Sequence, residues 1–374
     1  MPDAKVEVTP VNTKKDLSDF RKLPWKIYHN DPQWVPPLIS QQKVLFDKKK
    51  HPFFEHSEAD FFIARRGTET VGTIVAILNH RHNHVHQENV GFFGFFETIA
   101  DYQVAEKLLD TVMDWAKQKN LDYIRGPENY SQNEVCGLLV DGFDTPPVIL
   151  MAHNPPYYQT FIEKYGFTKA MDLWAYCMDT TTFIPERVVK VGESIKERTN
   201  VTFRTINKKD FKNEVERVKQ VYNQAWEKNW GFVPMTDHEI DHTARELVQI
   251  IDPDIVFFAE MDGKPIGFSL AVPDINQALQ KINGRLFPTG FFKLLYYARK
   301  VNRVRVIIMG VVSEYRNKGI DSVFYLDSYR KALEKGYNWG EFSWILENND
   351  PMNTALRNIG AHVYKTYRIY EKKV

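Results

Sequence analysis

The sequence has few cysteines, no long apolar run and almost no net charge. Cys136 and Cys177 are its only two cysteines, too few for a disulfide framework or a zinc cluster, so we expect both to be reduced and buried. No apolar run approaches the roughly 18 residues needed to cross a membrane. Lys+Arg 49 against Asp+Glu 48 gives a net charge of +1, so no overall field attracts DNA or an anionic membrane. We therefore expect a cytoplasmic protein with neither partner.

Apolar and aromatic residues, by contrast, are plentiful. Hydrophobic residues make up 43% of the chain, with 25 Phe, 18 Tyr and 8 Trp. This composition is typical of a packed globular protein rather than a disordered one. The length of 374 residues exceeds that of one typical domain and predicts two.

An internal repeat is the most informative feature of the sequence. Residues 61–72 (FFIARRGTETVG) and residues 256–267 (VFFAEMDGKPIG) align without a gap, with Gly72 opposite Gly267. Both stretches have the pattern of a strand, a tight turn and a second strand. A Lys-Lys-Asp motif precedes each hairpin, at residues 14–16 and 208–210. Because several matches occur in the same order, we infer a duplication.

The predicted elements follow the same order in both copies: strand, helix, hairpin, strand, helix, strand, short helix and strand. This order predicts the α+β class, with a mixed, mostly antiparallel sheet flanked by helices, in two domains at residues 1–182 and 183–374. The main predicted elements are residues 17–28, 61–72, 91–97, 102–119, 121–125 and 173–178 in the first copy, and residues 211–226, 256–267, 304–312, 322–335, 341–346 and 363–370 in the second.

A basic glycine turn separates a strand from a helix in the second copy. The near-continuous apolar run at residues 304–312 is followed by Arg316-Asn317-Lys318-Gly319-Ile320. A strand, a glycine turn and a helix start direct backbone N–H groups towards an anion. The turn resembles the acyl-CoA pyrophosphate loop of the GNAT superfamily of N-acyltransferases, although Asp321 stands where that family has glycine or alanine. The alternative is an ordinary capped helix start.

The resemblance implies two tandem GNAT-like domains and transfer of an acyl group, most simply acetyl, from acyl-CoA to an amine. It implies acetyl-CoA or another acyl-CoA as donor and no metal. Setting Gly94 opposite Gly310 places Ala100 at Arg316 and Gln103 at Gly319, so only the second copy is expected to bind the donor. The implied donor-binding residues are Met309, Val311 and Val312 on the strand, Arg316, Asn317, Lys318, Gly319 and Ile320 in the turn, and Asn349, whose alternative role is in a turn before a helix.

The tyrosine that GNAT enzymes commonly use as an acid is missing, since Leu356 and Ile162 occupy its places. Glu347, at the end of a predicted strand, is the candidate base that takes a proton from the ammonium group. Tyr367, on the final strand, is the candidate acid for the leaving thiolate. The structural alternatives are a carboxylate at the rim of the cleft and a half-buried strand tyrosine.

Two polar stretches of the first copy need separate interpretation. Residues 128–134 (ENYSQNE) are either a solvated loop or a polar pocket for the acceptor, with Asn129, Ser131, Asn133 and Glu134 as its floor and Tyr157 and Tyr158 as its walls. The histidines at residues 80, 82, 84 and 86 are either metal ligands or, as we favour, part of a solvated hairpin loop.

The sequence thus predicts an N-acyltransferase, most simply an N-acetyltransferase, acting on a small-molecule or peptide amine, with a homodimer left open. Two alternatives remain. A noncatalytic binding protein on a degenerate GNAT fold accounts for Asp321 and the missing tyrosine. An aminoacyl-tRNA-dependent transferase of the Fem type uses the same tandem fold, but the net charge supplies no field to attract RNA.

Overall fold

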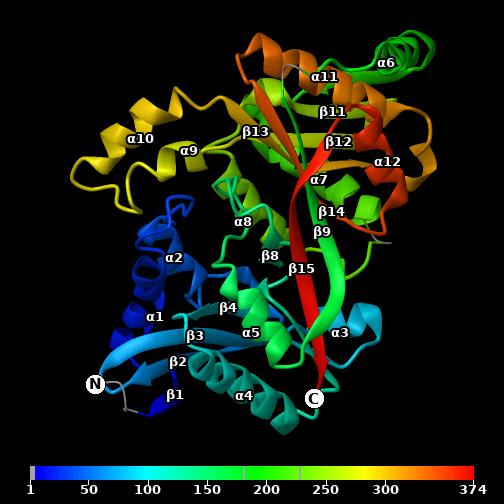
Figure 1. Cartoon of the computed structure of the whole chain (residues 1–374). Helices are drawn as coiled ribbons and strands as arrows, with labels where there is room; N and C mark the ends of the chain where they lie inside the picture. Colours follow the sequence, from blue (N-terminus) through cyan, green and yellow to red (C-terminus); the bar gives the residue numbers. More distant parts are fainter. Residues whose placement is uncertain (1–4, 180–181, 227–228) are drawn as a thin grey trace. The chain divides into compact units, whose positions relative to one another are not determined.

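A computed structural model describes residues 5–179, 182–226 and 229–374 (Figure 1). The chain forms two compact units that are not consecutive halves of the sequence. The first unit comprises Met1–Leu173, Ile282–Pro288 and Lys365–Val374, and the second comprises Trp174–Lys281 and Thr289–Tyr364. The C-terminal segment therefore belongs to the first unit.

The first unit is a sheet with helices packed on both faces. Strands β1 to β5 are adjacent in sequence order, and β15 (His362–Lys373) continues the sheet beside β5. Only β4 and β5 are parallel in this series. Its elements are β1 (Val6–Pro10), α1 (Lys14–Ile27), α2 (Ile39–Leu45), β2 (Glu58–Arg66), β3 (Glu69–Leu78), α3 (His80–His86), β4 (Val90–Thr98), α4 (Tyr102–Gln118), β5 (Tyr123–Gly126), β6 (Glu128–Asn129), β7 (Val135–Cys136), β8 (Leu138–Asp141), α5 (Tyr157–Lys164) and the first part of β9 (Thr168–Asp179).

Alternation along β2 explains why helices cover both faces, because successive side chains of a strand point to opposite sides. Ile63 packs in the same cluster as Phe20 of α1. Its neighbour Ala64 packs in the cluster that contains Leu108 of α4. All four side chains are buried.

The second unit repeats this arrangement. Its sheet has the order β10-β11-β12-β13-β14, and only β13 and β14 are parallel. The fold class is therefore α+β in two tandem copies, as predicted. The elements are α6 (Glu186–Arg198), β10 (Val201–Thr205), α7 (Phe211–Trp226), α8 (Asp237–Leu247), β11 (Val256–Met261), β12 (Lys264–Pro273), α9 (Asn276–Leu279), α10 (Gly290–Ala298), β13 (Arg303–Val311), α11 (Ile320–Glu334), β14 (Trp339–Leu346) and α12 (Asp350–Asn358).

The final strands do not complete the sheets of their own copies. The C-terminal part of β15 pairs antiparallel with β5, with Tyr370 opposite Gly126. The part of β9 that belongs to the second unit lies next to β14. Each copy thus contributes its last strand to the unit formed mainly by the other copy.

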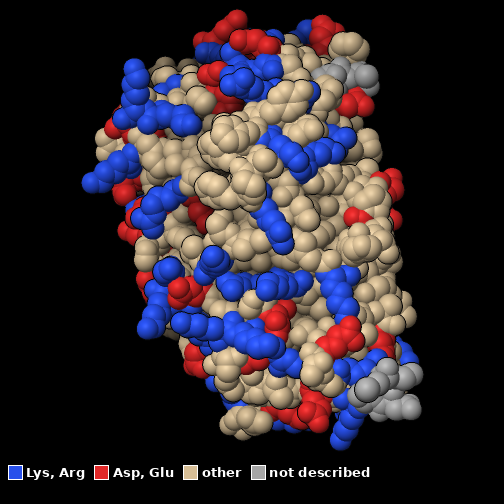
Figure 2. All heavy atoms as spheres, turned by 90° about the vertical axis from the view of Figure 1, so that its left-hand side faces the viewer, with Lys and Arg blue, Asp and Glu red and all other residues tan. Residues whose placement is uncertain are grey.

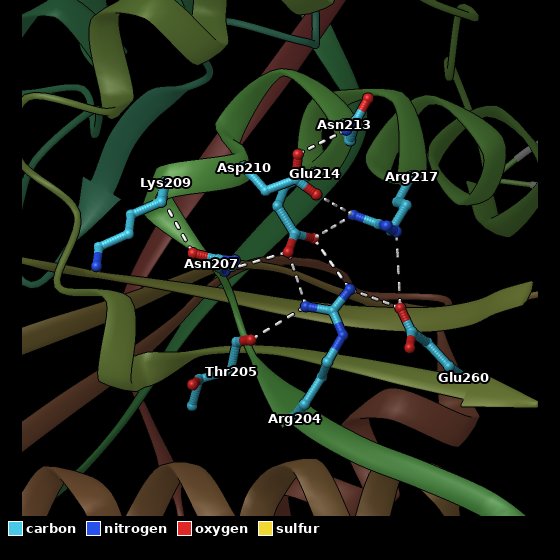
Figure 3. A network of polar contacts seen from close by, with 9 residues as sticks. All are labelled: Arg204, Thr205, Asn207, Lys209, Asp210, Asn213, Glu214, Arg217 and Glu260. Carbon is cyan, nitrogen blue, oxygen red and sulfur yellow. Dashed lines mark hydrogen bonds and ion pairs between the residues drawn. The ribbon is translucent and has the colours of Figure 1, made fainter. Parts of the chain in front are cut away.

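Figure 3 shows the ion network that fastens α7 to the sheet of the second unit. Arg204 on β10 donates hydrogen bonds to both carboxylate oxygens of Glu214 (2.8 and 3.1 Å) and to Glu260 (2.6 Å). The Glu214 side chain is 1% exposed, so these hydrogen bonds offset the cost of burying it. In the first unit, Arg65 on β2 holds Asp16 of α1 at 2.7 Å. In each unit an ion pair therefore joins a helix to the sheet, α1 after β1 in the first unit and α7 after β10 in the second.

The stretch of histidines forms the helix α3, so the predicted hairpin loop is wrong. Asn79 caps this helix by accepting the N–H of His82 at 3.0 Å. His82 is buried 2.9 Å from Glu88, and burial lowers its pKa to about 4. Within residues 5–179, 182–226 and 229–374, no group of three or more His, Cys, Asp or Glu side chains could hold a metal ion. None of the described helices has the length and apolar character needed to cross a bilayer.

Candidate functional site

Two neighbouring strands diverge in the second unit. β13 and β14 are paired only where Arg303–Val306 lies beside Trp339–Phe342, and the described residues show no pairing between them beyond this point. Both strands continue, to Val311 and Leu346 respectively. The edge of β13 that faces β14 is therefore open over its last residues.

Strand alternation decides which backbone groups face this opening. Val312 donates its N–H to the carbonyl oxygen of Ile266, on β12, at 2.9 Å. Because consecutive residues of a strand direct their N–H groups to opposite sides, those of Val311 and Met309 point to the side of β14. Two of the three predicted strand residues thus offer N–H groups to the opening, and the N–H of Val312 is already used.

The turn after β13 is held by the Arg316 side chain. Its guanidinium donates to the carbonyl oxygen of Val311 at 3.2 Å and to that of Ala225, on α7, at 2.6 Å. The side chain of Arg316 therefore acts structurally. Lys318 is exposed, and its Nζ lies 4.5 Å from the ring centre of Tyr315, so Lys318 is the cation of the turn that a ligand can reach.

Gly319 is the N-cap residue of α11 and has a φ of 81°, in a region that only glycine adopts readily. A Cβ atom there would also lie 3.0 Å from the Ile195 side chain of α6. No side chain caps α11, so the first N–H groups of this helix are left for another acceptor. Asp321 is exposed in the first helical turn, and Asn317 has a φ of 60°.

Glu347 and Asn349 follow β14, at the far side of the opening. Glu347 is half-buried, and its carbonyl oxygen accepts a hydrogen bond from the Asn353 side chain at 3.1 Å. Asn349 caps α12, with its Oδ1 accepting the N–H of Met352 at 3.3 Å. Asn349 therefore has the turn role that the sequence left as an alternative.

The other predicted catalytic residue, Tyr367, belongs to the first unit. It lies opposite Leu139 of β8 and is 1% exposed. Glu347 belongs to the second unit, so the two candidate catalytic residues are not part of one unit.

A buried ion pair lies where β13 and β14 are still paired. Arg305 and Glu341 are opposite each other in the sheet, with side chains 4% and 1% exposed. The Nε atom of Arg305 lies 4.0 Å from Glu341 and donates to Ser343 Oγ at 2.9 Å. Ser343 and Tyr364 also donate hydrogen bonds to the Glu341 carboxylate. This cluster stabilises the base of the opening.

The predicted acceptor residues of the first unit bond mainly to their own surroundings. Asn129 Oδ1 accepts the N–H of Phe95 on β4 at 2.7 Å. Ser131 Oγ accepts the N–H of Asn133 at 3.3 Å, and Glu134 accepts that of Tyr130 at 3.2 Å. Ser131 is buried, and Asn129, Asn133 and Glu134 are half-buried. The stretch is therefore not a solvated loop, and its polar groups hold its own shape.

The two predicted wall residues, Tyr157 and Tyr158, lie beside Glu97, a carboxylate that was not predicted as a site residue. Tyr158 donates to Glu97 at 2.7 Å, and Tyr157 donates to the carbonyl oxygen of Thr98 at 2.7 Å. Tyr28 also donates to Glu97, at 2.9 Å. Burial raises the pKa of Glu97 to about 7, so this group can exchange a proton near neutral pH. The signal in the sequence was a lone carboxylate at the end of the apolar strand GFFGFFE.

A further polar pair lies beside this cluster. The Nε2 atom of His153 lies 2.7 Å from Asp31, and the His153 carbonyl oxygen accepts a bond from Tyr28 at 3.2 Å. Burial lowers the pKa of His153 although Asp31 opposes the shift. The first unit thus contains its own cluster of buried titratable groups, in a place that sequence motifs did not indicate.

The register of the sheets corrects the alignment of the two copies. Gly72 pairs with Thr98 and Gly267 pairs with Val311, so Thr98 and Val311 are equivalent and the assignment of Gly94 to Gly310 is wrong. Gly94 pairs with Val75 whereas Gly310 pairs with Phe268, so the two glycines stand at different places in their ladders. Residues 99–101 join strand to helix in the first unit, and residues 312–319 do so in the second. The first unit lacks the turn because its connection is five residues shorter.

Comparison with known proteins gives two close relatives in sequence. The chain is 36% identical to the bacterial ceramide synthase of Caulobacter vibrioides over 380 residues, covering 99% of this chain and 98% of that protein. It is also 36% identical to the protein YghO of Escherichia coli over 369 residues, covering 96% of this chain and 94% of YghO. No protein-family model matches the chain.

Solved structures share the fold at low sequence identity. A tandem GNAT protein from the clavulanic acid biosynthesis pathway superposes with a TM-score of 0.57 at 11% identity, covering 99% of this chain and 98% of that protein. A GCN5-related N-acetyltransferase from Sphaerobacter thermophilus has a TM-score of 0.52 at 14% identity, covering 98% and 95%. The chain therefore has the fold of a tandem GNAT protein, and it belongs to the family that includes the bacterial ceramide synthase and YghO.

Proposed function

We propose that the chain is an N-acyltransferase that transfers a long-chain acyl group from acyl-CoA to the primary amine of a long-chain amino alcohol. A ceramide is the amide of such an amine with a fatty acid. The observation that carries the proposal is the 36% identity to a ceramide synthase over nearly the whole of both chains. The proposal replaces the acetyl group expected from the sequence by a longer acyl group.

The second unit is the proposed donor site. Acyl-CoA needs donors for its pyrophosphate and for the amides of its pantetheine arm. The uncapped start of α11 and the exposed Lys318 supply positive potential for the first need. The N–H groups of Met309 and Val311 on the open edge of β13 supply the second. Side chains are not required for the second role, which suits the apolar sequence of this strand.

The reaction forms one bond and breaks another. The amine nitrogen attacks the thioester carbonyl carbon, the C–N bond forms, the C–S bond breaks, and the thiolate of CoA takes up a proton. An ammonium group must first lose a proton, and Glu347 at the end of β14 is the proposed acceptor of that proton. Tyr367, on the final strand, remains the proposed acid that gives a proton to the leaving thiolate.

The test is an assay with a matched set of substrates. The purified protein is incubated with hexadecanoyl-CoA or acetyl-CoA, and with a long-chain 2-amino-1,3-diol or with ethanolamine, which has the amino alcohol without the chain. Release of CoA is measured with a thiol reagent, and the amide is identified by mass spectrometry. We expect turnover with the two long-chain substrates together. Faster turnover of acetyl-CoA, or of ethanolamine, would refute the proposed substrate class.

Glu347→Gln tests the proposed base, with Glu334→Gln at the exposed end of α11 as the matched control. We expect Glu347→Gln to lower kcat by roughly a hundredfold or more and the control to keep parental turnover. Parental turnover in Glu347→Gln would reject this residue as the base.

A further inference from the structure

The helix α10 exposes a cluster of large apolar side chains. Its sequence is GFFKLLYYA, and Phe291, Phe292, Leu295 and Tyr296 are 47%, 71%, 49% and 56% exposed. Figure 1 shows α10 apart from the strands of the second unit, at the left edge of the view. Large apolar side chains gathered on one exposed helix usually mark an interaction site.

The opposite face of α10 is also apolar. Leu294, Tyr297 and Ala298 are half-buried and occur at the three- and four-residue spacing of one helix face. A helix that is apolar all round normally lies inside a protein or in contact with lipid. Since the outer face of α10 is not covered by the described residues, the structure leaves that face for another partner.

The stretch of sequence that contains α10 has charged residues of one sign only. No Asp or Glu occurs between Asp274 and Glu314, a stretch that contains seven Lys and Arg residues. Lys293 lies within the helix, and Arg299 and Lys300 follow it directly; all three are exposed. The net charge of +1 for the whole chain conceals this local excess.

Figure 2 shows the face of the molecule that carries α10. Its upper half has an uncharged area, with Lys and Arg side chains beside it and some Asp and Glu side chains farther out. An apolar centre with a basic border fits the boundary between the acyl chains and the headgroups of an anionic membrane, where Phe, Leu and Tyr enter and Lys and Arg meet phosphate.

We propose that α10 docks the protein on the surface of an anionic lipid bilayer, with Phe291, Phe292, Leu295 and Tyr296 inserted between the headgroups. A second copy of the chain is a poorer occupant of this face. Two identical patches in a two-fold contact would bring the basic borders together without a carboxylate from this segment to offset them. The inference rests on the α10 surface and is independent of the proposed reaction. It replaces the expectation, drawn from net charge alone, that the protein has no membrane partner.

Vesicle sedimentation of the full chain tests the proposal. Vesicles of phosphatidylcholine and phosphatidylglycerol are compared with vesicles of phosphatidylcholine alone, at low and at high salt. We expect binding to the anionic vesicles, and weaker binding when salt screens the charges. Equal binding to both vesicle types, or no binding to either, would overturn the proposal.

Two sets of variants separate the apolar and the basic contribution. Phe292→Ser combined with Leu295→Ser removes apolar area and is expected to weaken vesicle binding roughly tenfold. Lys293→Gln combined with Lys300→Gln is expected to weaken it roughly fivefold per charge. Phe183→Ser, at a residue that is 82% exposed and outside α10, is the matched control and should bind like the parent.

Circular dichroism checks that each variant is folded, and sedimentation velocity without lipid measures self-association. Parental vesicle binding by both double variants would overturn the proposal. So would dimers of the parent that dissociate in Phe292→Ser/Leu295→Ser while no form binds vesicles, because the occupant would then be a second copy.

Discussion

The two units share the order of their main elements, and the connection from strand to helix before α4 differs from the one before α11. In the first unit three residues lead from β4 to α4, and the Asp101 side chain caps the helix by accepting the N–H of Gln103 at 2.9 Å. Arg66 holds the same carboxylate at 2.6 Å. In the second unit eight residues lead from β13 to α11, which has no side-chain cap. A closed helix start and an open one thus arose from the same duplicated element.

The edge of β4 in the first unit is covered, whereas the corresponding edge of β13 in the second unit is open. In the first unit β4 pairs with β5 only at residues 90–92, and farther along β4 the segment after β5 lies against it. The approach is so close that a Cβ atom on Gly94 would be 1.8 Å from the Glu128 carbonyl oxygen. Asn129 uses the N–H of Phe95. In the second unit β13 has no such cover from the segment after β14 among the described residues. The first unit uses internally the groups that the second unit leaves for a ligand.

The largest expected effect concerns the buried ion pair at the base of the opening. Arg305→Met should lower the free energy of unfolding by about 3–5 kcal/mol, because Glu341 is 1% exposed and loses a positive partner inside the protein. Arg125→Met is the matched change in the first unit. It should cost only about 1–2 kcal/mol, since its partners Glu88 and Glu371 are 36% and 33% exposed and can be hydrated.

Urea unfolding of both variants measures the difference. Arg305→Met/Glu341→Leu serves as control, because removing both charges should recover much of the lost stability. Equal losses in Arg305→Met and Arg125→Met would show that the two strand pairs are stabilised alike.

The next effect belongs to the first unit and depends on pH. Burial raises the pKa of Glu97 to about 7, above its usual value of 4.5. Between these pH values the unfolded chain has lost the proton and the folded protein keeps it, so stability falls as pH rises. Glu97→Gln lacks this dependence. The stability of the parent relative to Glu97→Gln should therefore decrease by about 2–3 kcal/mol from pH 4 to pH 8.

Unfolding curves of parent and variant across this pH range measure the effect. Tyr158→Phe sharpens the test, because the hydrogen bond from Tyr158 lowers the pKa of Glu97 and its loss should move the transition to higher pH. A constant difference between parent and Glu97→Gln would show that this carboxyl titrates normally.

A smaller effect is expected at the turn of the second unit. Lys318→Glu reverses the exposed charge next to the open start of α11 and should weaken CoA binding roughly tenfold. Lys107→Glu, an exposed change on the equivalent helix of the first unit, should leave binding unaltered. Isothermal titration with CoA measures both. Gly319→Glu is a poorer test, because any side chain at a φ of 81° strains the turn itself.

Sequence reasoning recovered the features that depend on local pattern. The two hairpins, the strand before the basic turn and the helix at Tyr102–Gln118 follow from periodicity and turn residues, and the structure confirms them. The histidine helix was missed because its polar sequence has no apolar face, and its capping residue Asn79 was not considered. When no N-cap residue is recognised, the helix propensities of such a polar stretch favour a loop.

Features that depend on pairing between segments far apart in the sequence could not be predicted. The exchange of β9 and β15 between units leaves both strands with the same apolar pattern as strands that stay in their own sheet. The assignment of Gly94 to Gly310 matched two glycines in similar apolar strands, and only the pairing with the neighbouring strand shows that they are not equivalent. The Glu97 cluster joins Tyr28, Glu97 and Tyr158 from three distant segments, so no spacing in the sequence reveals it.

The smallest expected effect tests the residue by which the turn departs from the GNAT pattern. Asp321 is exposed in the first turn of α11, where water screens its repulsion of a bound phosphate. Asp321→Asn should therefore raise CoA affinity only about threefold, and should lower helix stability by about 0.3–1 kcal/mol through loss of a favourable charge at the helix start. Isothermal titration at low salt measures the first change. An affinity increase of a hundredfold would mean that the carboxylate faces the phosphate directly, and no increase at all would place the phosphate away from this helix.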